Sequence, residues 1–292
     1  MASVRPGVSS LAAVRIATWN VNSVRARTAR VVDWLQRADV DVLALQEIKC
    51  RDDQFPHEAF EHAGYEVVTH GFNQWNGVAF ASRIGLEDVQ RDFPGMPGFG
   101  SALPDGTLPP EARAMAVTVG DGIRLWSLYV PNGRELGSPH YPYKLEWLRR
   151  LREVTAAWLA EHPDGPLALM GDWNIAPLDQ DVWDMRVFDG STHVSPPERT
   201  EFAEFESIGL TDVVRPLVPK GFTYWDYKQL RFPRNEGMRI DFILGSPAFA
   251  DLVTSAAIER NERKGDAPSD HVPVLVDLDV ESPLDDDRPM IF

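Results

Sequence analysis

Short apolar runs, many of them rich in β-branched or aromatic residues, recur along the chain and constrain its fold more than any other feature. Each run is four to seven residues long, as expected for strands of a sheet. Several runs are joined by loops rather than helices, so part of the pairing should be antiparallel. We expect strands at 16–19, 42–46, 65–69, 78–81, 114–119, 125–130, 167–170, 239–244 and 272–278.

Two segments have the apolar spacing of amphipathic helices. Ser23 is placed to cap the first, whose apolar residues recur at helical spacing up to Ala38. The second spans 143–160. The Pro- and Gly-rich stretch 93–110 predicts a surface loop, and so does 190–200.

The length of 292 residues predicts a single α/β domain at 14–280, between a flexible N-terminal segment, 1–13, and an acidic C-terminal tail, 281–292. No run reaches the roughly 18 apolar residues of a membrane-spanning helix. Met1 to Ala13 lacks the pattern of a signal peptide, and the lone Cys50 cannot form an internal disulfide. We therefore expect a cytoplasmic protein that does not bind membranes.

A formal net charge of −15 argues against a passive nucleic-acid coat, because Lys and Arg supply most non-specific affinity for phosphates. It does not exclude a nuclease, which gathers carboxylates around a cation and meets phosphates along a separate basic strip. The candidates for that strip are Lys49, Arg134, Lys144 and the loop Lys228 to Arg239, which contains Arg231 and Arg234.

Polar side chains stand at the ends of several predicted strands. Gly171-Asp172-Trp173-Asn174 follows the apolar run 167–170, and Asn20, Glu47, Asp241 and Asp270-His271 adjoin other runs. A single such pattern is usually only a core strand meeting its turn. Its repetition favours an active site, since α/β enzymes carry their chemistry at strand ends.

These residue types suit metal-assisted hydrolysis. Mg²⁺ prefers oxygen ligands, and Glu47, Asp270 and Asn20 supply them, whereas no thiolate or paired-His motif indicates zinc. Asp172 is a candidate general acid or base, and Asn174 a donor to developing phosphorane charge.

His271 has two readings. A histidine near the start of a strand is usually structural. If a carboxylate such as Asp241 accepts its Nδ1 hydrogen, the ring is oriented for phosphate chemistry instead.

The order of the motifs resembles that of the exonuclease III type of apurinic/apyrimidinic (AP) endonuclease, within the endonuclease/exonuclease/phosphatase superfamily. The resemblance extends from about Arg15 to Leu278, and the segments 52–56 and 222–227 match the nuclease branch. The motifs are Thr18 to Arg27, Leu45-Gln46-Glu47-Ile48-Lys49, Tyr129-Val130-Pro131-Asn132-Gly133, Gly171-Asp172-Trp173-Asn174-Ile175, Arg239-Ile240-Asp241 and Pro268-Ser269-Asp270-His271.

The resemblance implies a four-layer α/β sandwich, with two packed mixed β-sheets and outer helices, of the DNase I-like kind. It implies an Mg²⁺-dependent enzyme, with Mn²⁺ as a possible substitute. We expect this enzyme to act as a monomer. The implied substrate is duplex DNA, cleaved 5′ to abasic sites or trimmed at its 3′ ends as by a 3′–5′ exonuclease or 3′-phosphodiesterase.

The resemblance also implies roles for individual residues. Glu47 would be the principal metal ligand, with Asn20, Asp270, Asp172 and Asn174 in or beside the metal site. Asp172 would also transfer a proton, and Asn174 would hold the scissile phosphate.

The remaining implied roles concern the phosphate and the sugar. Tyr129 and His271, the latter oriented by Asp241, would act at the phosphate, and Arg113 and Asn132 would bind substrate. Tyr224 and Trp225 would wall the pocket for the base-free sugar. The sequence departs from the family pattern at Tyr224, where Trp is expected, and at Trp173, which is bulkier than usual.

Two other functions remain open on the same fold. One is a non-catalytic RNA-binding regulator, against which the intact polar set argues. The other is a phosphatase or lipid phosphodiesterase, against which the nuclease-type motifs argue.

Overall fold

A computed structural model describes residues 12–120 and 122–280, so the acidic tail and residues 1–11 of the predicted N-terminal segment lie outside the description. Two six-stranded sheets form the centre, with strand orders β11-β12-β1-β2-β4-β3 (sheet A) and β5-β6-β7-β8-β10-β9 (sheet B). The strands are β1 (Ala12–Asn20), β2 (Val42–Gln46), β3 (Glu66–His70), β4 (Val78–Ser82), β5 (Glu87–Arg91), β6 (Ala114–Val119), β7 (Ile123–Tyr129), β8 (Leu167–Asp172), β9 (Thr211–Asp212), β10 (Asp241–Gly245), β11 (Val253–Ile258) and β12 (Val274–Val280).

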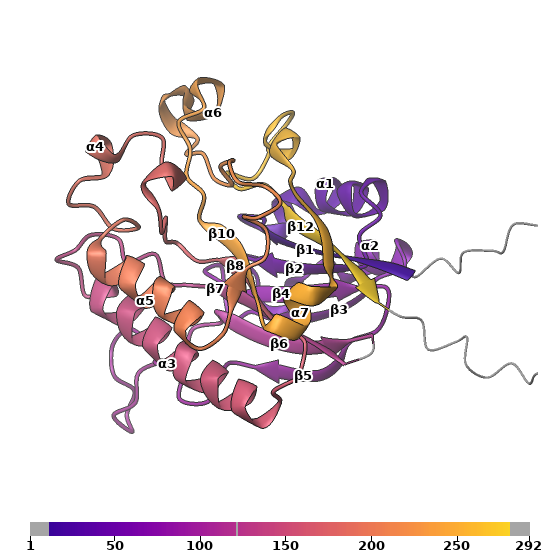
Figure 1. Ribbon diagram of the computed structural model, residues 1–292, viewed down its shortest axis with the longest axis horizontal. Helices are drawn as coiled ribbons and strands as arrows, with labels where there is room; N and C mark the ends of the chain where they lie inside the picture. The colour runs from indigo at the N-terminus through magenta and orange to yellow at the C-terminus, as the bar shows by residue number, and fades with distance from the viewer. Residues whose placement is uncertain (1–11, 121, 281–292) are drawn as a thin grey trace, which may run out of the picture.

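Helices cover the outer face of each sheet (Figure 1). Sheet A is covered by α1 and α2, and sheet B by α3 and α5, which lie side by side. The helices are α1 (Val24–Arg37), α2 (His57–His62), α3 (His140–Glu161), α4 (Met185–Phe188), α5 (Pro196–Ser207), α6 (Arg231–Arg234) and α7 (Pro247–Leu252), and short 3-10 turns occur at Asp52–Gln54, Asp179–Asp181, Lys228–Leu230 and Arg260–Arg263.

Both sheets are mixed. The pairs β1–β2 and β7–β8 are parallel, and the other neighbouring strands are antiparallel. The four-layer α/β sandwich and its mixed pairing are therefore confirmed. None of the helices within 12–120 and 122–280 is long and apolar enough to cross a bilayer.

Alternation of side chains along the strands builds three apolar layers, because successive residues of a strand point to opposite faces. Ile16 and Met170 face the core between the sheets. Their neighbours Ala17 and Leu169 face outward, against the α1 and α3 sides respectively. The central strands are consequently apolar on both faces and read as continuous runs.

The sequence pattern does not predict three edge strands, β5, β9 and β11. β5 is largely exposed and carries Glu87, Asp88, Gln90 and Arg91, residues that protect a sheet edge from further pairing but give no apolar pattern. The two-residue β9 is too short to leave a pattern. β11 was also missed, although its residues are mostly half-buried.

Three local predictions need correction. Ser23 stands at the N-terminus of α1, but its side chain makes no capping bond, and its backbone N–H donates to the Glu47 carbonyl at 2.7 Å. The segment 190–200 is not a loop throughout, because α5 starts at Pro196. β1 starts at Ala12, ahead of the predicted domain boundary. The loop at 93–110 is confirmed.

Candidate functional site

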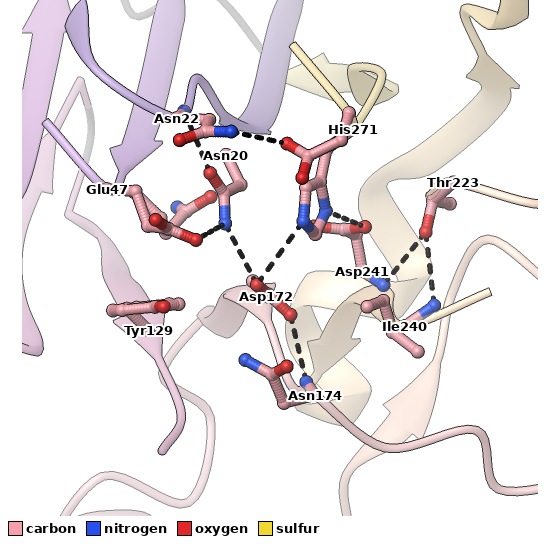
Figure 2. Close-up of polar contacts among 12 residues, drawn as sticks. Asn20, Asn22, Glu47, Tyr129, Asp172, Asn174, Thr223, Ile240, Asp241 and His271 are labelled. Carbon is pink, nitrogen blue, oxygen red and sulfur yellow. Dashed lines mark hydrogen bonds and ion pairs between the residues drawn. The ribbon is translucent and has the colours of Figure 1, made fainter. Parts of the chain in front are cut away.

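Strand ends from both sheets meet at one place and bring the predicted polar residues together (Figure 2). Tyr129, Asp172 and Asp241 are register partners across β7, β8 and β10, so they form one row on sheet B. Asn20 ends β1 of sheet A, and Glu47 directly follows β2. His271 approaches from the segment before β12.

Unusual backbone conformations aim these side chains. Glu47 and Asn174 both have φ of 51°, which is uncommon for residues with a side chain and stores strain of about 1–3 kcal/mol each. Gly171 has φ of 147°, and a Cβ there would stand 2.0 Å from the Leu128 carbonyl oxygen. Only glycine therefore lets β8 lie against β7 directly before Asp172.

Asp172 is the centre of the cluster and is almost completely buried. Its Oδ2 accepts a hydrogen bond from Asn20 Nδ2 at 2.9 Å, and its Oδ1 accepts one from the Asn174 backbone N–H at 2.9 Å. Burial raises the pKa of Asp172 to about 7, with the charges of Asp241 and Glu47 acting in the same direction and His271 opposing them. The carboxyl group is thus suited to exchange protons near neutral pH.

His271 lies between two carboxylates. Its Nδ1 is 2.9 Å from Asp241 Oδ2, and its Nε2 is 3.7 Å from Asp172 Oδ2. Burial alone would lower the pKa of this ring, but Asp241 and Asp172 outweigh burial and raise it to about 10. The ring is therefore a charged donor whose orientation Asp241 fixes, as predicted.

Thr223 holds Asp241 in turn, because its Oγ1 accepts the backbone N–H groups of Ile240 and Asp241, each at 3.1 Å. Thr223 is not among the residues that the sequence predicts for the site. A hydroxyl in an aromatic run carries no signal of that function.

Glu47 presents its carboxylate beside Asp172. Its Oε1 accepts from Asn20 Nδ2 at 2.9 Å, and its Oε2 pairs with Lys49 Nζ at 2.6 Å. Burial raises the pKa of Glu47, but Lys49 and Asn20 more than offset this effect and leave it below its usual value. Ligand atoms of Glu47, Asp172 and His271 all lie within 4.8 Å of one another.

Asp270, predicted to lie in or beside the metal site, contacts the cluster through Asn22. It is not among the three residues of that tight group; its Oδ1 accepts from Asn22 Nδ2 at 3.0 Å. Asn22 also receives a hydrogen bond from Lys49 at its Oδ1 (2.5 Å). Asn22 therefore links Asp270 to Lys49, the residue that pairs with Glu47.

Tyr129 closes the side of the cluster below Glu47 (Figure 2). The Arg113 guanidinium stacks over its ring at 4.8 Å, and Glu111 pairs with Arg113 at 2.8 Å. Burial, then the charge of Glu47, holds the pKa of Tyr129 well above its usual value, so the phenol stays protonated and can donate. Arg113, predicted to bind substrate, is buried, and its guanidinium contacts the Tyr129 ring.

Asn174 and Asn132 form an amide pair. Asn132 Nδ2 donates to Asn174 Oδ1 at 2.9 Å, and Asn174 Nδ2 donates to the Val130 carbonyl at 3.0 Å. One Nδ2 hydrogen of Asn174 is left for a ligand, since an amide nitrogen carries two.

Of the two predicted sugar-pocket residues, only Tyr224 borders the cluster. Its ring centre is 4.9 Å from that of His271, and it lines a cavity of about 290 Å³ with Trp183, His193 and Met238. Trp225 is fully buried, packed edge-on against Phe222 and Phe232, so it supports the loop rather than walling that cavity.

The remaining departures concern Lys144 and Trp173. Lys144 is not on a basic strip: it is fully buried and pairs with Glu198 of α5. Trp173 is also fully buried and packs edge-on against Phe202 and Phe205 of α5. Its bulk therefore anchors that helix to the strand that carries Asp172. Ser195-Pro196-Pro197-Glu198 was an available helix-start signal for α5.

Comparisons with known proteins agree with this geometry. Residues 17–271 match the model of the Endonuclease/Exonuclease/phosphatase family. The chain is 29% identical to exodeoxyribonuclease III of Haemophilus influenzae, over 91% of this chain and 100% of that protein.

Solved structures agree as well. A 3′ phosphatase from Neisseria, bound to a product DNA hairpin, superposes with a TM-score of 0.84 at 37% identity, over 91% of this chain and all of that one. An AP endonuclease from Archaeoglobus fulgidus gives 0.81 at 31% identity, with the same coverage. This chain therefore belongs to the endonuclease/exonuclease/phosphatase family, and it is a hydrolytic nuclease related to exodeoxyribonuclease III and the AP endonucleases.

Proposed function

We propose that this protein is a Mg²⁺-dependent DNA-repair nuclease that hydrolyses duplex DNA 5′ to abasic sites and removes nucleotides or blocking groups from 3′ ends. The observation that carries the proposal is the cluster in which Asp172, the charged His271 and the Glu47 carboxylate lie within 4.8 Å of one another. Metal-assisted phosphodiester hydrolysis requires a group that carries a proton, a group that donates hydrogen bonds to the charged phosphate oxygens, and a negatively charged ligand for the cation. Asp172, His271 and Glu47 would supply these in turn.

The donor chemistry fits a hard divalent cation. Glu47 is partly exposed, and the Lys49 ammonium, 2.6 Å from its Oε2, offsets burial and lowers the pKa of the carboxyl group, so Glu47 is ionised as a cation ligand must be. Glu47 would hold Mg²⁺, with the other positions left to water and phosphate; Mn²⁺ has compatible ligand preferences. Asn20, predicted as an oxygen ligand, instead turns its Nδ2 toward Glu47 and Asp172 and its Oδ1 toward the Asn22 backbone N–H at 3.0 Å, so it would orient the two carboxylates. When bound, the cation supplies charge neutralisation at the phosphate. Asp270, whose Oδ1 accepts from Asn22 Nδ2, would adjoin the cation site.

The chain's own residues account for the proton and charge movements. Water attacks phosphorus, the bond to the 3′ oxygen breaks, and that oxygen leaves as a hydroxyl. Asp172 takes a proton from the attacking water and passes it to the leaving 3′ oxygen. Hydrogen bonds from Asn20 Nδ2 and the Asn174 backbone N–H hold its two oxygens in place for this transfer. The His271 Nε2–H, the Tyr129 hydroxyl and the free Asn174 Nδ2–H donate to the phosphate oxygens.

A groove beside Tyr129 suits a nucleic-acid strand. It has a volume of about 590 Å³ and is lined by Trp75, Asn132, Arg134 and His140, among others. The Trp75 ring is 65% exposed, so it offers a stacking surface next to cations, a combination that binds nucleic acid. The cavity under Tyr224 adjoins the cluster on the other side and would take an abasic sugar, which costs less to unstack than an intact nucleotide.

We propose that the protein acts as a monomer in the cytoplasm. One chain supplies all of the polar residues of the cluster, which supports action as a monomer. Cys50 is a buried free thiol of the kind that persists in a reducing compartment, which supports the cytoplasmic location.

The test is an incision assay on a duplex with one central abasic analogue and on a duplex with a 3′-blocked nick, each with Mg²⁺ or with chelator. The wild type should cleave both duplexes, and the cleavage rate of Asp172→Asn should be about two to four orders of magnitude lower. Asp53→Asn, at an exposed acid paired with Arg51, is the matched control and should cleave normally. If the wild type cleaves neither duplex, the proposal is refuted. If it cleaves only the nicked duplex, the proposed activity at abasic sites is refuted.

A further inference from the structure

Lys144 of α3 is a charged residue in the interior of the protein, paired with Glu198 of α5. Both side chains are fully buried, and Nζ lies 2.5 Å from Glu198 Oε1. Burying such a pair is costly, and apolar residues of similar size often give equal or greater stability. Stability alone therefore gives no reason for a lysine at this position.

The ammonium group has three hydrogens and three acceptors. Besides Glu198, Nζ donates to the Asn174 carbonyl at 2.7 Å and to the Asn132 carbonyl at 3.3 Å. These carbonyls belong to the two loops that follow the parallel strands β7 and β8. One buried nitrogen thus ties together the two loops that carry the amide pair of the site.

The path from Lys144 to Asp172 is short. Asn132 and Asn174 are joined through their side chains at 2.9 Å, and the Asn174 backbone N–H donates to Asp172 Oδ1 at 2.9 Å. The loop at Gly133 packs closely on the lysine stem, because a Cβ there would stand 3.1 Å from Lys144 Cδ. A shift of Nζ would therefore be felt at both amides and at the Asp172 carboxylate.

Glu198 holds the ammonium in place and is itself saturated. Its carboxylate accepts from Thr192 Oγ1, from the His193 backbone N–H and from Ser195. His193 also contacts the carbonyl oxygen to which Lys144 donates, since its Nδ1 lies 2.5 Å from the Asn174 carbonyl oxygen. The segment 192–195 and α5 thus brace Lys144 from the side opposite the strands.

We infer that Lys144 is a positioning residue for phosphodiester hydrolysis: its buried ammonium, braced by Glu198, clamps the Asn132 and Asn174 carbonyls and so sets where the Asn174 amide and the Asp172 carboxylate stand. This inference deepens the proposed function and rests on it.

The rival explanation is that the pair matters only to folding, and a pair of variants separates the two. Lys144→Met leaves Glu198 buried without its partner and should lose both stability and activity. Lys144→Met/Glu198→Gln removes both charges at nearly constant volume and should regain most of the lost melting temperature. The clamp on the two carbonyls is still missing in the double variant. Its kcat on the abasic duplex should therefore stay about 10- to 100-fold below wild type, with KM changed less than about threefold.

The control is Arg215→Met/Asp181→Asn. It breaks another pair with a buried acid, at 2.9 Å, that touches none of the site residues, and should keep the wild-type kcat. A double variant at Lys144 and Glu198 with wild-type kcat overturns the inference. If the wild type itself cleaves nothing, the proposed function fails first, and the amide signals below still test the clamp.

A second measurement does not depend on the neutral variant folding. Lys144→Arg keeps a cation opposite Glu198, but a planar guanidinium cannot direct hydrogens from one nitrogen at all three acceptors. We expect a lower kcat and shifted side-chain amide signals of Asn132 and Asn174 in ¹⁵N spectra, with those of Asn235 unmoved. Unchanged kcat and unchanged amide signals overturn the inference.

Discussion

Asp172 and Asp241 are register partners on the antiparallel strands β8 and β10, and the His271 ring lies between their carboxylates, 3.7 Å from the first and 2.9 Å from the second. Sheet pairing thus places two acids side by side, and one cation keeps them from repelling. The two acids have different partners: Asp241 meets Thr223 and His271, whereas Asp172 faces the substrate side with Asn20. Under the proposed function, these environments suit Asp241 to orienting His271 and Asp172 to proton transfer.

Asp241→Asn should impair catalysis without unfolding the protein. An amide cannot hold the imidazolium as a carboxylate does, so His271 loses both its charge partner and its fixed orientation. We expect kcat on the abasic duplex to fall about 10- to 100-fold. Steady-state kinetics at pH 7 check this, with circular dichroism to verify folding. A folded variant with wild-type kcat would contradict the orienting role.

Glu47→Gln should weaken cation binding more than it weakens folding. The amide keeps the hydrogen-bonding shape opposite Asn20 but removes the negative charge that a hard cation requires. The Mg²⁺ concentration for half-maximal cleavage should rise at least about tenfold. A Mg²⁺ titration of the cleavage rate measures it, and chelation of the wild type should abolish activity reversibly. Activity that persists in excess chelator would rule out the metal role.

Gly171→Ala should destabilise the protein as well as inactivate it. The new Cβ would stand 2.0 Å from the Leu128 carbonyl, in a backbone conformation with φ of 147° that L residues avoid. Relief requires β8 to move away from β7, at a cost of about 2 kcal/mol or more. Urea unfolding measures the loss. Gly85→Ala is the matched control for positive φ in open space, and it should cost less.

Glu198→Gln should destabilise the protein most near neutral pH. Burial raises the pKa of Glu198, but Lys144 outweighs burial and brings it below the ordinary 4.5. A folded-state pKa below the unfolded one means that the carboxylate stabilises the fold above about pH 4.5 and loses this effect as pH falls through the folded value. Urea unfolding should show a loss of about 3 kcal/mol at pH 7 that shrinks below pH 4. A loss independent of pH would contradict the charge argument.

Much of the fold could be predicted because buried strands need apolar residues on both faces. The nine predicted strands all exist, with ends shifted by up to a few residues. Edge strand β5 could not be predicted, since its exposed Glu87 to Arg91 satisfy no apolar pattern. α5 begins with Ser-Pro-Pro-Glu, and there the capping signal was present but was outweighed by the neighbouring Gly and Pro residues.

The candidate site was less predictable in its supports than in its centre. Asp172, His271 and Glu47 stand out because acids and histidine at strand ends are unusual. Lys144 has no such signal: a lysine in an amphipathic helix is normally solvated, and only the approach of α5 buries it. Trp225 was predicted to wall the sugar pocket but is buried, because the sequence does not indicate on which side an aromatic residue of a loop packs.

The two sheets each supply only part of the cluster: Asn20, Glu47 and His271 come from sheet A, and Tyr129, Asp172 and Asp241 from sheet B. His271 leads into β12, which pairs with β1 from the opposite end of the described chain. If these residues form the active site, we expect the nuclease to stay inert during synthesis until nearly all of the domain has left the ribosome and the sheets have docked. We likewise expect a partly folded chain not to cut DNA, so that the return of cleavage during refolding would report the moment at which the two halves of the sandwich close.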